Sequence, residues 1–374
     1  MASVTRDDIK IQTALVEAVK LSHQAQPVSA SISTASTDPQ SVTIKSFHPS
    51  FSSVIGETPT FSLLVSADAS RNPFFHKGCA YVTATDELYA TSDLLQSSSS
   101  SRLPVVLISK LSFRRSSDLG PPGKTKTSTA AITSLEWMKL RPPSNMAMPA
   151  GAIPYEKGVL YCSQGTLEAN SGGLFHMPLG KPPVSIVANY FGRPFNSVQG
   201  VVKSNLALWF TDSCAGFEQE IRPPPQLPCH VYWFSLTTGE LRVVVDGLQR
   251  PTGIALSPNQ HILYVTDTEA ASPGNSSAST SPATIYAYDI ILRTSASPCV
   301  MNKRVFAFAF SGVPAAITCD PAGNVYAACA DGVEVWNSEG VCSSLCFGRE
   351  GELFVCGGQT LWRVQLNGAV FHSS

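Results

Sequence analysis

The chain has 374 residues, with 26 Lys and Arg, 27 Asp and Glu, and a net charge of −1. Charged residues make up 14% of it, against roughly 25% in ordinary soluble proteins, so no basic surface for nucleic acid or anionic membranes is expected. Hydrophobic residues reach 43%, while 26 Gly and 27 Pro interrupt the chain too often for long helices. These numbers indicate a β-rich globular protein.

The first residues lack the features of a targeting or membrane segment. MASVTRDDIK carries charges where a signal peptide needs an apolar run. No later segment approaches the roughly 18 apolar residues of a membrane span. The sequence therefore predicts a cytoplasmic protein without a membrane span. Apolar residues at helical spacing predict a helix over Arg6–Ser22, and we assign residues 1–45 to this helix and a linker.

A short phrase recurs six times along the rest of the chain. It begins with an apolar residue followed by an aromatic one, continues to Thr, Ser or another small residue, and sometimes ends in Asp. Another short segment precedes each copy, with turn-forming residues between the two, which is typical of a β-hairpin. The six copies are Leu88–Ser92, Leu160–Ser163, Leu208–Asp212, Leu263–Asp267, Val325–Ala328 and Leu353–Cys356.

Further strands follow most of these hairpins, for example Val231–Ser235 and Ile285–Asp289. Six units of four antiparallel strands describe a six-bladed β-propeller, which we assign to residues 46–374. The first strand of each unit then lines a central channel. The last unit is short, so we predict that an N-terminal strand near Thr60–Val65 closes the ring. The expected fold is all-β, a six-bladed β-propeller with an N-terminal helical extension.

Ten cysteines occur without a CxxC pair. In a reducing compartment we interpret most of them as small buried hydrophobic residues. Cys214 and Cys229 flank one loop, which leaves open the alternative that an oxidant pairs them.

Several of the first strands resemble those of a known family. The motifs FHKGCAYV, FNSVQG, RPTGIALS and VPAAI are similar to motifs of the fungal lactonohydrolase branch of the senescence marker protein/gluconolactonase/luciferin-regenerating enzyme family. The resemblance spans about residues 46–366 and implies the same six-bladed propeller. It also implies a hydrolase of sugar lactones or related esters that holds one Ca²⁺ or Zn²⁺ in the channel.

The metal ligands that this resemblance implies are replaced here. The family pattern has a Glu, two Asn and an Asp where this chain has Lys77, Gln199, Thr252 and Ala315. An ammonium group repels a dication, and two neutral oxygens beside it are a poor ligand set for Ca²⁺ or Zn²⁺. We therefore expect no metal and no cofactor, and we reject metal-dependent lactone hydrolysis.

What remains is a propeller with a metal-free pocket. Lys77, Gln199 and Thr252 form the predicted catalytic set of hydrogen-bond donors. Small residues from the other units leave room for a substrate, and aromatic rings supply apolar walls, unless these rings are core between blades. The predicted substrate-binding residues are Ala150, Ala315 and Ser344, with Tyr81, Tyr155, Phe195 and Trp209 as the aromatic walls.

Such a pocket resembles that of a recruited subset of the family, the fungal hetero-Diels–Alderases of tropolone sesquiterpenoid biosynthesis. The resemblance implies a metal-independent pericyclase that joins an ortho-quinone methide, derived from a tropolone or phenol, to a humulene-type sesquiterpene. In this hypothesis Lys77 is the donor or general acid at the carbonyl oxygen, and Gln199 and Thr252 orient the oxygens. The predicted partners are these two small molecules.

Other interpretations of the same residues stay open. Lys77 is also consistent with an ion pair to Asp212 or Asp267 that neutralises a former metal site. We interpret both Asp residues as caps of strand ends, and His76 as a packing residue on the opposite side of its strand. Two alternative functions also remain: a non-catalytic small-molecule-binding propeller, and a divergent lactonase or hydrolase, although the sequence has no G-x-S-x-G elbow.

Overall fold

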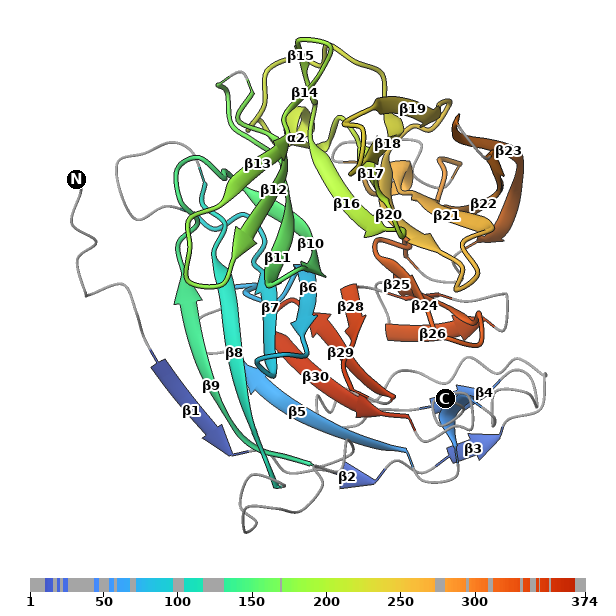
Figure 1. The fold of residues 1–374 in the computed structure, drawn as a ribbon. Helices are drawn as coiled ribbons and strands as arrows, with labels where there is room; N and C mark the ends of the chain where they lie inside the picture. Colours follow the sequence, from blue (N-terminus) through green and yellow to red (C-terminus); the bar gives the residue numbers. More distant parts are fainter. Residues whose placement is uncertain are drawn as a thin grey trace.

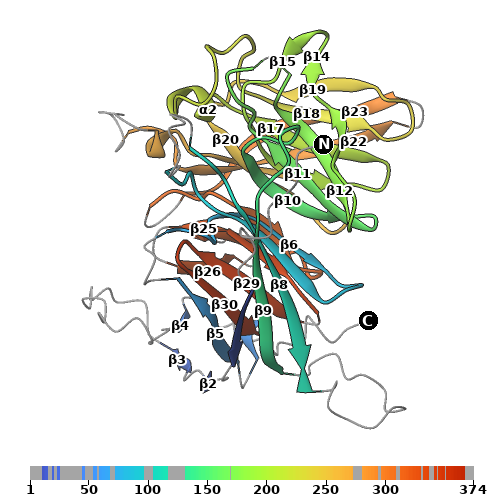
Figure 2. The ribbon, with the colours of Figure 1, turned by 90° about the vertical axis from the view of Figure 1, so that its left-hand side faces the viewer.

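A computed structural model gives the fold as a ring of antiparallel sheets, the blades of a propeller (Figures 1 and 2). It describes residues 11–15, 19–20, 23–25, 44–46, 54–56, 59–67, 72–96, 104–116, 131–168, 170–272, 280–293, 296–308, 312–329, 332–336, 341–342, 344–349 and 351–366.

The first five blades follow one another along the chain, each built from inside to outside. Blade 1 is β6 (Lys77–Val82), β7 (Glu87–Thr91), β8 (Ile108–Arg115) and β9 (Ile132–Leu140). Blade 2 is β10 (Pro149–Tyr155), β11 (Gly158–Ser163), β12 (Gly173–Pro178) and β13 (Val184–Val187). Blade 3 is β16 (Val198–Lys203), β17 (Ala207–Asp212), β18 (His230–Ser235) and β19 (Leu241–Val245). Blade 4 is β20 (Pro251–Leu256), β21 (Ile262–Asp267), β22 (Thr284–Arg293) and β23 (Ala296–Phe308). Blade 5 is β24 (Ile317–Cys319), β25 (Val325–Cys329), β26 (Gly332–Trp336) and β27 (Val341–Cys342).

Blade 6 takes its outer strand from the N-terminal part of the chain. Its strands β28 (Ser344–Phe347), β29 (Glu352–Gly357) and β30 (Thr360–Gln365) are followed by β5 (Thr60–Ser66), which pairs antiparallel with β30. The prediction that a strand near Thr60–Val65 closes the ring is therefore confirmed. Closure of this kind pairs a strand edge that the short last unit would leave open.

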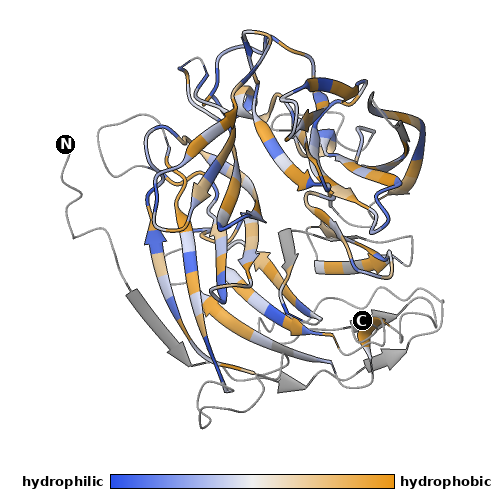
Figure 3. Cartoon of the chain, viewed as in Figure 1, coloured by the Kyte–Doolittle hydropathy of each residue, from blue (hydrophilic) through white to orange (hydrophobic). Residues whose placement is uncertain are grey.

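The recurring apolar phrase is the second strand of every blade, as predicted: β7, β11, β17, β21, β25 and β29. These strands lie in the middle of the sheets, and all six residues of both β11 and β17 are buried. Figure 3 shows hydrophobic residues concentrated along the strands. Aromatic rings fill the space within and between the blades, for example Phe210 stacked on Tyr232 at 5.2 Å.

A buried ion cluster joins blades 1 and 6, on either side of the closure. Arg115 of β8 is 1% exposed, and its guanidinium donates to both oxygens of Asp86 (2.7 and 3.0 Å) and both oxygens of Glu352 (2.7 and 2.9 Å). Arg363 of β30 also donates to Glu352, at 2.6 Å. Each buried charge thus has partners of opposite sign, without which its burial would be costly.

The N-terminal helix is not confirmed. Of the range Arg6–Ser22, the described residues are two strands: β1 (Ile11–Leu15), which pairs with β9 at the outer edge of blade 1, and β2 (Val19–Lys20), which pairs with β5. The open backbone edges of β9 and β5 supply hydrogen-bond partners that helical periodicity does not reveal. Further along the chain, β3 (His23–Ala25) pairs with β4 (Ile44–Ser46) in parallel.

The remaining described elements are short. The hairpin β14 (Asn189–Tyr190) and β15 (Arg193–Pro194) lies between blades 2 and 3, α2 (Ala215–Glu218) follows β17, and the 3-10 turn η4 (Glu269–Ala271) follows β21. Among the described residues, none of the helices has the length and apolar character needed to cross a membrane.

Candidate functional site

The starts of the inner strands meet around one end of the channel. In four blades a glycine follows the predicted site position, and a Cβ added to it would lie between 2.2 and 2.5 Å from the carbonyl oxygen of the site residue in the next blade. Only glycine allows this approach. The contacts run from Gly78 to Ala150, from Gly151 to Gln199, from Gly200 to Thr252, and from Gly253 to Ala315.

Threonines of the second strands fix these contacts. Thr211 accepts a hydrogen bond from the Gly200 amide (3.0 Å) and donates its own hydroxyl hydrogen to the Thr252 carbonyl (2.7 Å). Thr266 accepts from the Gly253 amide in the same way (2.7 Å). The Thr of the recurring phrase is therefore a link between neighbouring blades, and the site residues occupy equivalent positions around the ring.

The structure brings Lys77 and Gln199 together across the start of blade 2. Lys77 Nζ donates to Gln199 Oε1 at 3.1 Å. The intervening residue at this level is Ala150, which is 1% exposed and has no long side chain to block the contact. Two of the three predicted catalytic residues therefore form one hydrogen-bonded pair.

A second layer of side chains orients the Gln199 amide. Its Nε2 donates to Gln164 Oε1 (3.0 Å) and to Ser197 Oγ (2.7 Å). All three side chains belong to buried residues, 4%, 4% and 0% exposed for Gln199, Gln164 and Ser197. Because both hydrogens of Nε2 face protein acceptors, the amide oxygen is turned toward Lys77, and Gln199 holds the lysine.

Burial lowers the pKa of Lys77, because desolvation disfavours the ammonium form. The Asp93 carboxylate raises the pKa and opposes this effect, while the nearby Arg250 guanidinium lowers it further. Among the described residues, Lys77 forms no ion pair with Asp212 or Asp267, and Gln199 Oε1 is its one hydrogen-bond acceptor. No described residue therefore accepts from the other two ammonium hydrogens.

Thr252 occupies the equivalent position in blade 4, but it does not join the Lys77–Gln199 pair. Its hydroxyl lies 2.7 Å from Thr268 Oγ1 and donates to the Arg250 carbonyl at 3.2 Å. Ala315 is partly exposed at the same level of blade 5, and Ser344 begins the inner strand of blade 6. The structure thus places the backbone of these three positions on the ring, and no described contact joins the Thr252 side chain to the Lys77–Gln199 pair.

The four rings predicted as pocket walls are packed inside the blades. Tyr81, Tyr155, Phe195 and Trp209 are 3%, 7%, 1% and 2% exposed and belong to hydrophobic clusters. They present almost no surface to a ligand in this structure, so the alternative that they are core fits their placement. Tyr81, Tyr155 and Trp209 lie in strands whose register turns them toward a neighbouring sheet, and Phe195, which precedes β16, packs against Phe210 and Tyr232.

Asp212 and Asp267 cap backbone amides, as their structural interpretation predicted. Asp212 accepts from the amides of Asn196 (3.0 Å) and Ser197 (2.6 Å). Asp267 accepts from Arg250 (2.8 Å) in the same way. Burial raises the pKa of Asp212 to about 7, although these two amides and the Arg222 guanidinium oppose the shift.

The prediction that His76 is a packing residue is wrong. Its side chain is 40% exposed, and Nε2 lies 3.7 Å from Asp93 Oδ1. His76 precedes β6, which begins at Lys77, so the alternation of faces along a strand, on which the prediction depended, does not extend to it.

The donor set at the ring does not fit a divalent cation. The amide oxygen of Gln199, which would have to face the metal, accepts a hydrogen bond from the Lys77 ammonium group. Across the described ranges, no three His, Cys, Asp or Glu side chains lie close enough together to hold a metal ion. We therefore derive no chemical step through a metal.

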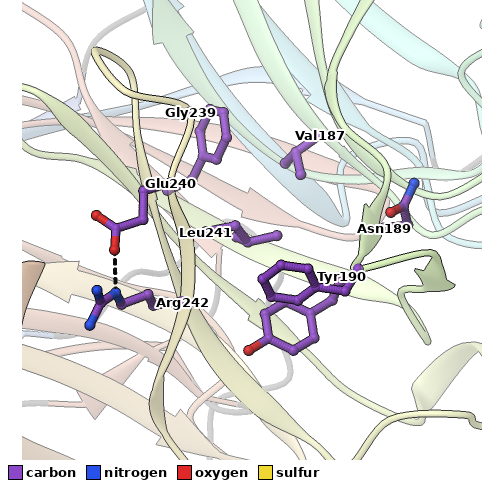
Figure 4. Close-up of a pocket in the computed structure, with 9 residues that line it drawn as sticks. Val187, Asn189, Tyr190, Gly239, Glu240, Leu241 and Arg242 are labelled. Carbon is purple, nitrogen blue, oxygen red and sulfur yellow. Dashed lines mark hydrogen bonds and ion pairs between the residues drawn. The ribbon is translucent and has the colours of Figure 1, made fainter.

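Two hollows lie away from Lys77. One, of about 410 Å³, lies at the opposite ends of the inner strands, where Leu256, Cys319 and Phe347 line it. The other, of about 610 Å³, lies between blades 2 and 3 beside the β14–β15 hairpin. Figure 4 shows Tyr190 and Leu241 in this second hollow, with the ion pair of Glu240 and Arg242 nearby. Neither hollow includes a predicted site residue.

Comparison with known proteins identifies the family. The sequence profile of the SMP-30/Gluconolactonase/LRE-like region matches residues 146–341, just over half of the chain. The chain belongs to the SMP-30/gluconolactonase/LRE-like family. Family membership agrees with the motifs at the starts of the inner strands.

Individual relatives of this SMP-30/gluconolactonase-like chain are distant. It is 27% identical to the lactonohydrolase oryL of Aspergillus oryzae over 77% of its own length and 63% of that protein. It is also 27% identical to a gluconolactonase of Zymomonas mobilis over 50% of its own length and 55% of that protein. The chain thus spans less than two thirds of the length of both relatives.

A solved structure shows the same fold. A gluconolactonase from Xanthomonas campestris superimposes with a TM-score of 0.61 at 19% identity, covering 85% of this chain and 93% of that one. The six-bladed propeller is therefore shared.

Sequence reasoning missed Gln164, Ser197 and Asp93. Gln164 directly follows Ser163, the last residue of the recurring phrase in blade 2. The equivalent position holds Asp212 in blade 3 and Asp267 in blade 4. This exception within the repeat was a signal that could have been noticed. The positions of Ser197 and Asp93 relative to Lys77 depend on how loops from different blades meet, and no sequence pattern gives that.

Proposed function

We propose that the Lys77 end of the channel binds small organic substrates without a metal and catalyses a hetero-Diels–Alder cycloaddition. The substrates are an ortho-quinone methide, derived from a tropolone or phenol, and a humulene-type sesquiterpene. The observation that carries the proposal is the bond from Lys77 Nζ to Gln199 Oε1. It puts an oriented ammonium donor where the family resemblance implies a metal-binding carboxylate.

The chemistry needs a donor and two aligned reactants. Loss of water from a hydroxymethyl precursor gives the quinone methide, and the cycloaddition then forms one C–C and one C–O bond, with no leaving group and no net proton transfer. A hydrogen bond to the quinone methide oxygen makes this heterodiene more electron-poor. One oriented donor in a dry site is worth about 2.7–4 kcal/mol, and alignment of the two reactants can supply about 7–11 kcal/mol.

The contacts divide the roles among the residues. Lys77 is the direct donor, because two of its ammonium hydrogens are not used by the described residues. Gln199 is a positioning residue, because its amide hydrogens are held by Gln164 and Ser197. Thr252 is a secondary donor whose hydroxyl must exchange its bond to Thr268 or to the Arg250 carbonyl for a bond to substrate.

Lactone hydrolysis is the second candidate function. Both curated relatives described above carry names of lactone-cleaving enzymes. A hydrolase on this chain would have to activate water without the acidic ligands of the family pattern. A third candidate, a binding propeller without catalysis, is favoured by the hollow between blades 2 and 3.

The deciding experiment mixes the purified chain with a quinone methide precursor and a humulenol. The spontaneous reaction in buffer gives a racemic adduct, and we expect the protein to give a faster reaction and one enantiomer. Lys77→Met should abolish the enantiomeric excess with the fold intact by circular dichroism. Arg114→Met, on the exposed side of β8, is the matched control and should behave as wild type.

The alternatives give different results in the same set of assays. Hydrolysis of aldonolactones with no effect on the adduct would support the hydrolase. Binding of the sesquiterpene with a racemic product would support the binding propeller. Either result refutes the proposed cycloaddition.

A further inference from the structure

We propose that Cys214 and Cys229 form an intrachain disulfide that fastens residues 213–229, here called the cap segment, over the Lys77 end of the channel. The two Sγ atoms lie 3.3 Å apart, and both residues are partly exposed. A small oxidant can therefore reach them, and only a short movement of one side chain separates the thiols from bonding distance. The inference is independent of the proposed function.

The cap segment extends from blade 3 to its neighbours. Ile221 is fully buried and packs with Val106, from the loop between β7 and β8, and with Met148, which precedes β10. Glu218 of α2 forms an ion pair with Arg250 at 3.0 Å, immediately before β20. The segment thus contacts blades 1, 2 and 4 on the side where the inner strands begin.

A buried arginine ties the middle of the cap segment to the start of blade 3. Arg222 is 3% exposed and donates to the carbonyls of Phe195 (2.6 Å) and Asn196 (2.8 Å). A Cβ on Gly216 would lie 3.0 Å from Ser197 Oγ, the hydroxyl that accepts from Gln199. The cap segment therefore lies directly against the side chains that orient Gln199, and a disulfide at its base would tie its two ends together.

The two thiols differ in reactivity. The hydrogen bond from the Cys229 thiol lowers the pKa of Cys214, while burial and the nearby carboxylates of Asp212, Glu218 and Glu269 oppose the shift. The same hydrogen bond and burial raise the pKa of Cys229. Cys214 is thus the attacking thiol and Cys229 the resolving one.

Oxidised glutathione is a suitable oxidant for the exchange. Cys214 loses its proton, and its thiolate attacks one glutathione sulfur and breaks the S–S bond, so that one glutathione leaves as a thiolate and takes up a proton. Cys229 then loses its proton and attacks Cys214 Sγ, which releases the second glutathione in the same way. Two protein thiols and one glutathione disulfide give one protein disulfide and two molecules of glutathione.

The chain contains a matched pair that should not react. Cys79 and Cys356 are also hydrogen-bonded to each other, but they are 6% and 2% exposed. An oxidant of the size of glutathione cannot reach them in the folded protein. The proposal therefore predicts oxidation of one pair and protection of the other under native conditions.

The test uses the full-length native protein, oxidised with glutathione disulfide, alkylated with iodoacetamide, and digested after glutamate without reduction. Cleavage at Glu218 and Glu220 separates Cys214 from Cys229 unless a disulfide joins their peptides. We expect the joined peptides, a loss of two free thiols that dithiothreitol reverses, and slower amide hydrogen exchange in α2. Cys214→Ser should abolish the loss of thiols, and Cys319→Ser, at a partly exposed cysteine of blade 5, should not.

Three results would overturn the proposal. Alkylation of both Cys214 and Cys229 after oxidation would show that they do not pair. A stable glutathione adduct on Cys214 would show that Cys229 does not resolve it. Joined peptides with unchanged exchange in α2 would show that the bond forms but fastens nothing. The linked peptide is measured on the wild-type chain, so the test does not depend on the folding of a variant.

Discussion

Replacing Arg115 with Met removes the centre of the ion cluster between blades 1 and 6. The change leaves Glu352, which is fully buried, with one guanidinium partner in place of two, and it takes from Asp86 the two hydrogen bonds at 2.7 and 3.0 Å. Breaking a buried ion pair by removing one partner costs about 3–5 kcal/mol. We expect a loss of this size in the free energy of unfolding, measured by urea denaturation with tryptophan fluorescence and circular dichroism.

The neighbouring residue provides the control. Arg114 pairs with Glu136 at 3.0 Å, but the two side chains are 70% and 45% exposed, so Arg114→Met should cost less than about 1 kcal/mol. Adding Glu352→Gln to Arg115→Met should cost less than the two single changes together, because the carboxylate that lost a partner is then neutral. Equal losses for Arg114→Met and Arg115→Met would refute the reasoning that the buried cluster holds the ring closed.

Three further predictions concern the site. The pKa of Lys77 in the folded chain lies below its ordinary value of 10.5. At pH values between the folded-state and unfolded-state pKa the unfolded chain binds more protons, so the free energy of unfolding should rise with pH over that range. Urea titrations should show this rise in wild type and its loss in Lys77→Met. Gln164→Leu should lower the free energy of unfolding by about 1–3 kcal/mol, because Gln199 Nε2 loses a buried acceptor. It should also slow single-turnover cycloaddition, and an unchanged rate would show that Gln164 does not position the catalytic residues. Gly200→Ala places a Cβ 2.4 Å from the Thr252 carbonyl, so overpacking should cost at least about 1–3 kcal/mol, visible as a lower melting temperature.

The architecture could be predicted because it repeats. The phrase that contains Thr211 and Thr266 recurs because every blade needs a buried second strand, and these two threonines also link their blades to the next one. The short last unit indicated closure by a strand near residue 60, and β5 is that strand. The same strand pattern occurs in six blades, so a wrong strand assignment in one blade does not change the predicted fold.

Features that depend on contacts between blades could not be predicted. Apolar periodicity suggested a helix where β1 pairs with the open edge of β9, because periodicity does not report a free strand edge. The burial of Tyr81 and Phe195 depends on the facing sheet. The bond from Lys77 to Gln199 joins residues 122 positions apart, and only the curvature of the ring brings them together.

The most direct test of the central claim is the stereochemistry of the adduct when divalent metal ions are removed. The purified chain is dialysed against a chelator, assayed with the quinone methide precursor and the humulenol, and assayed again after addition of Ca²⁺ or Zn²⁺. Metal-independent catalysis by Lys77 should give the same rate and the same single enantiomer in all samples, with both effects lost in Lys77→Met. A racemic adduct from the wild-type chain, or an enantiomeric excess that appears only when metal is added, would contradict it.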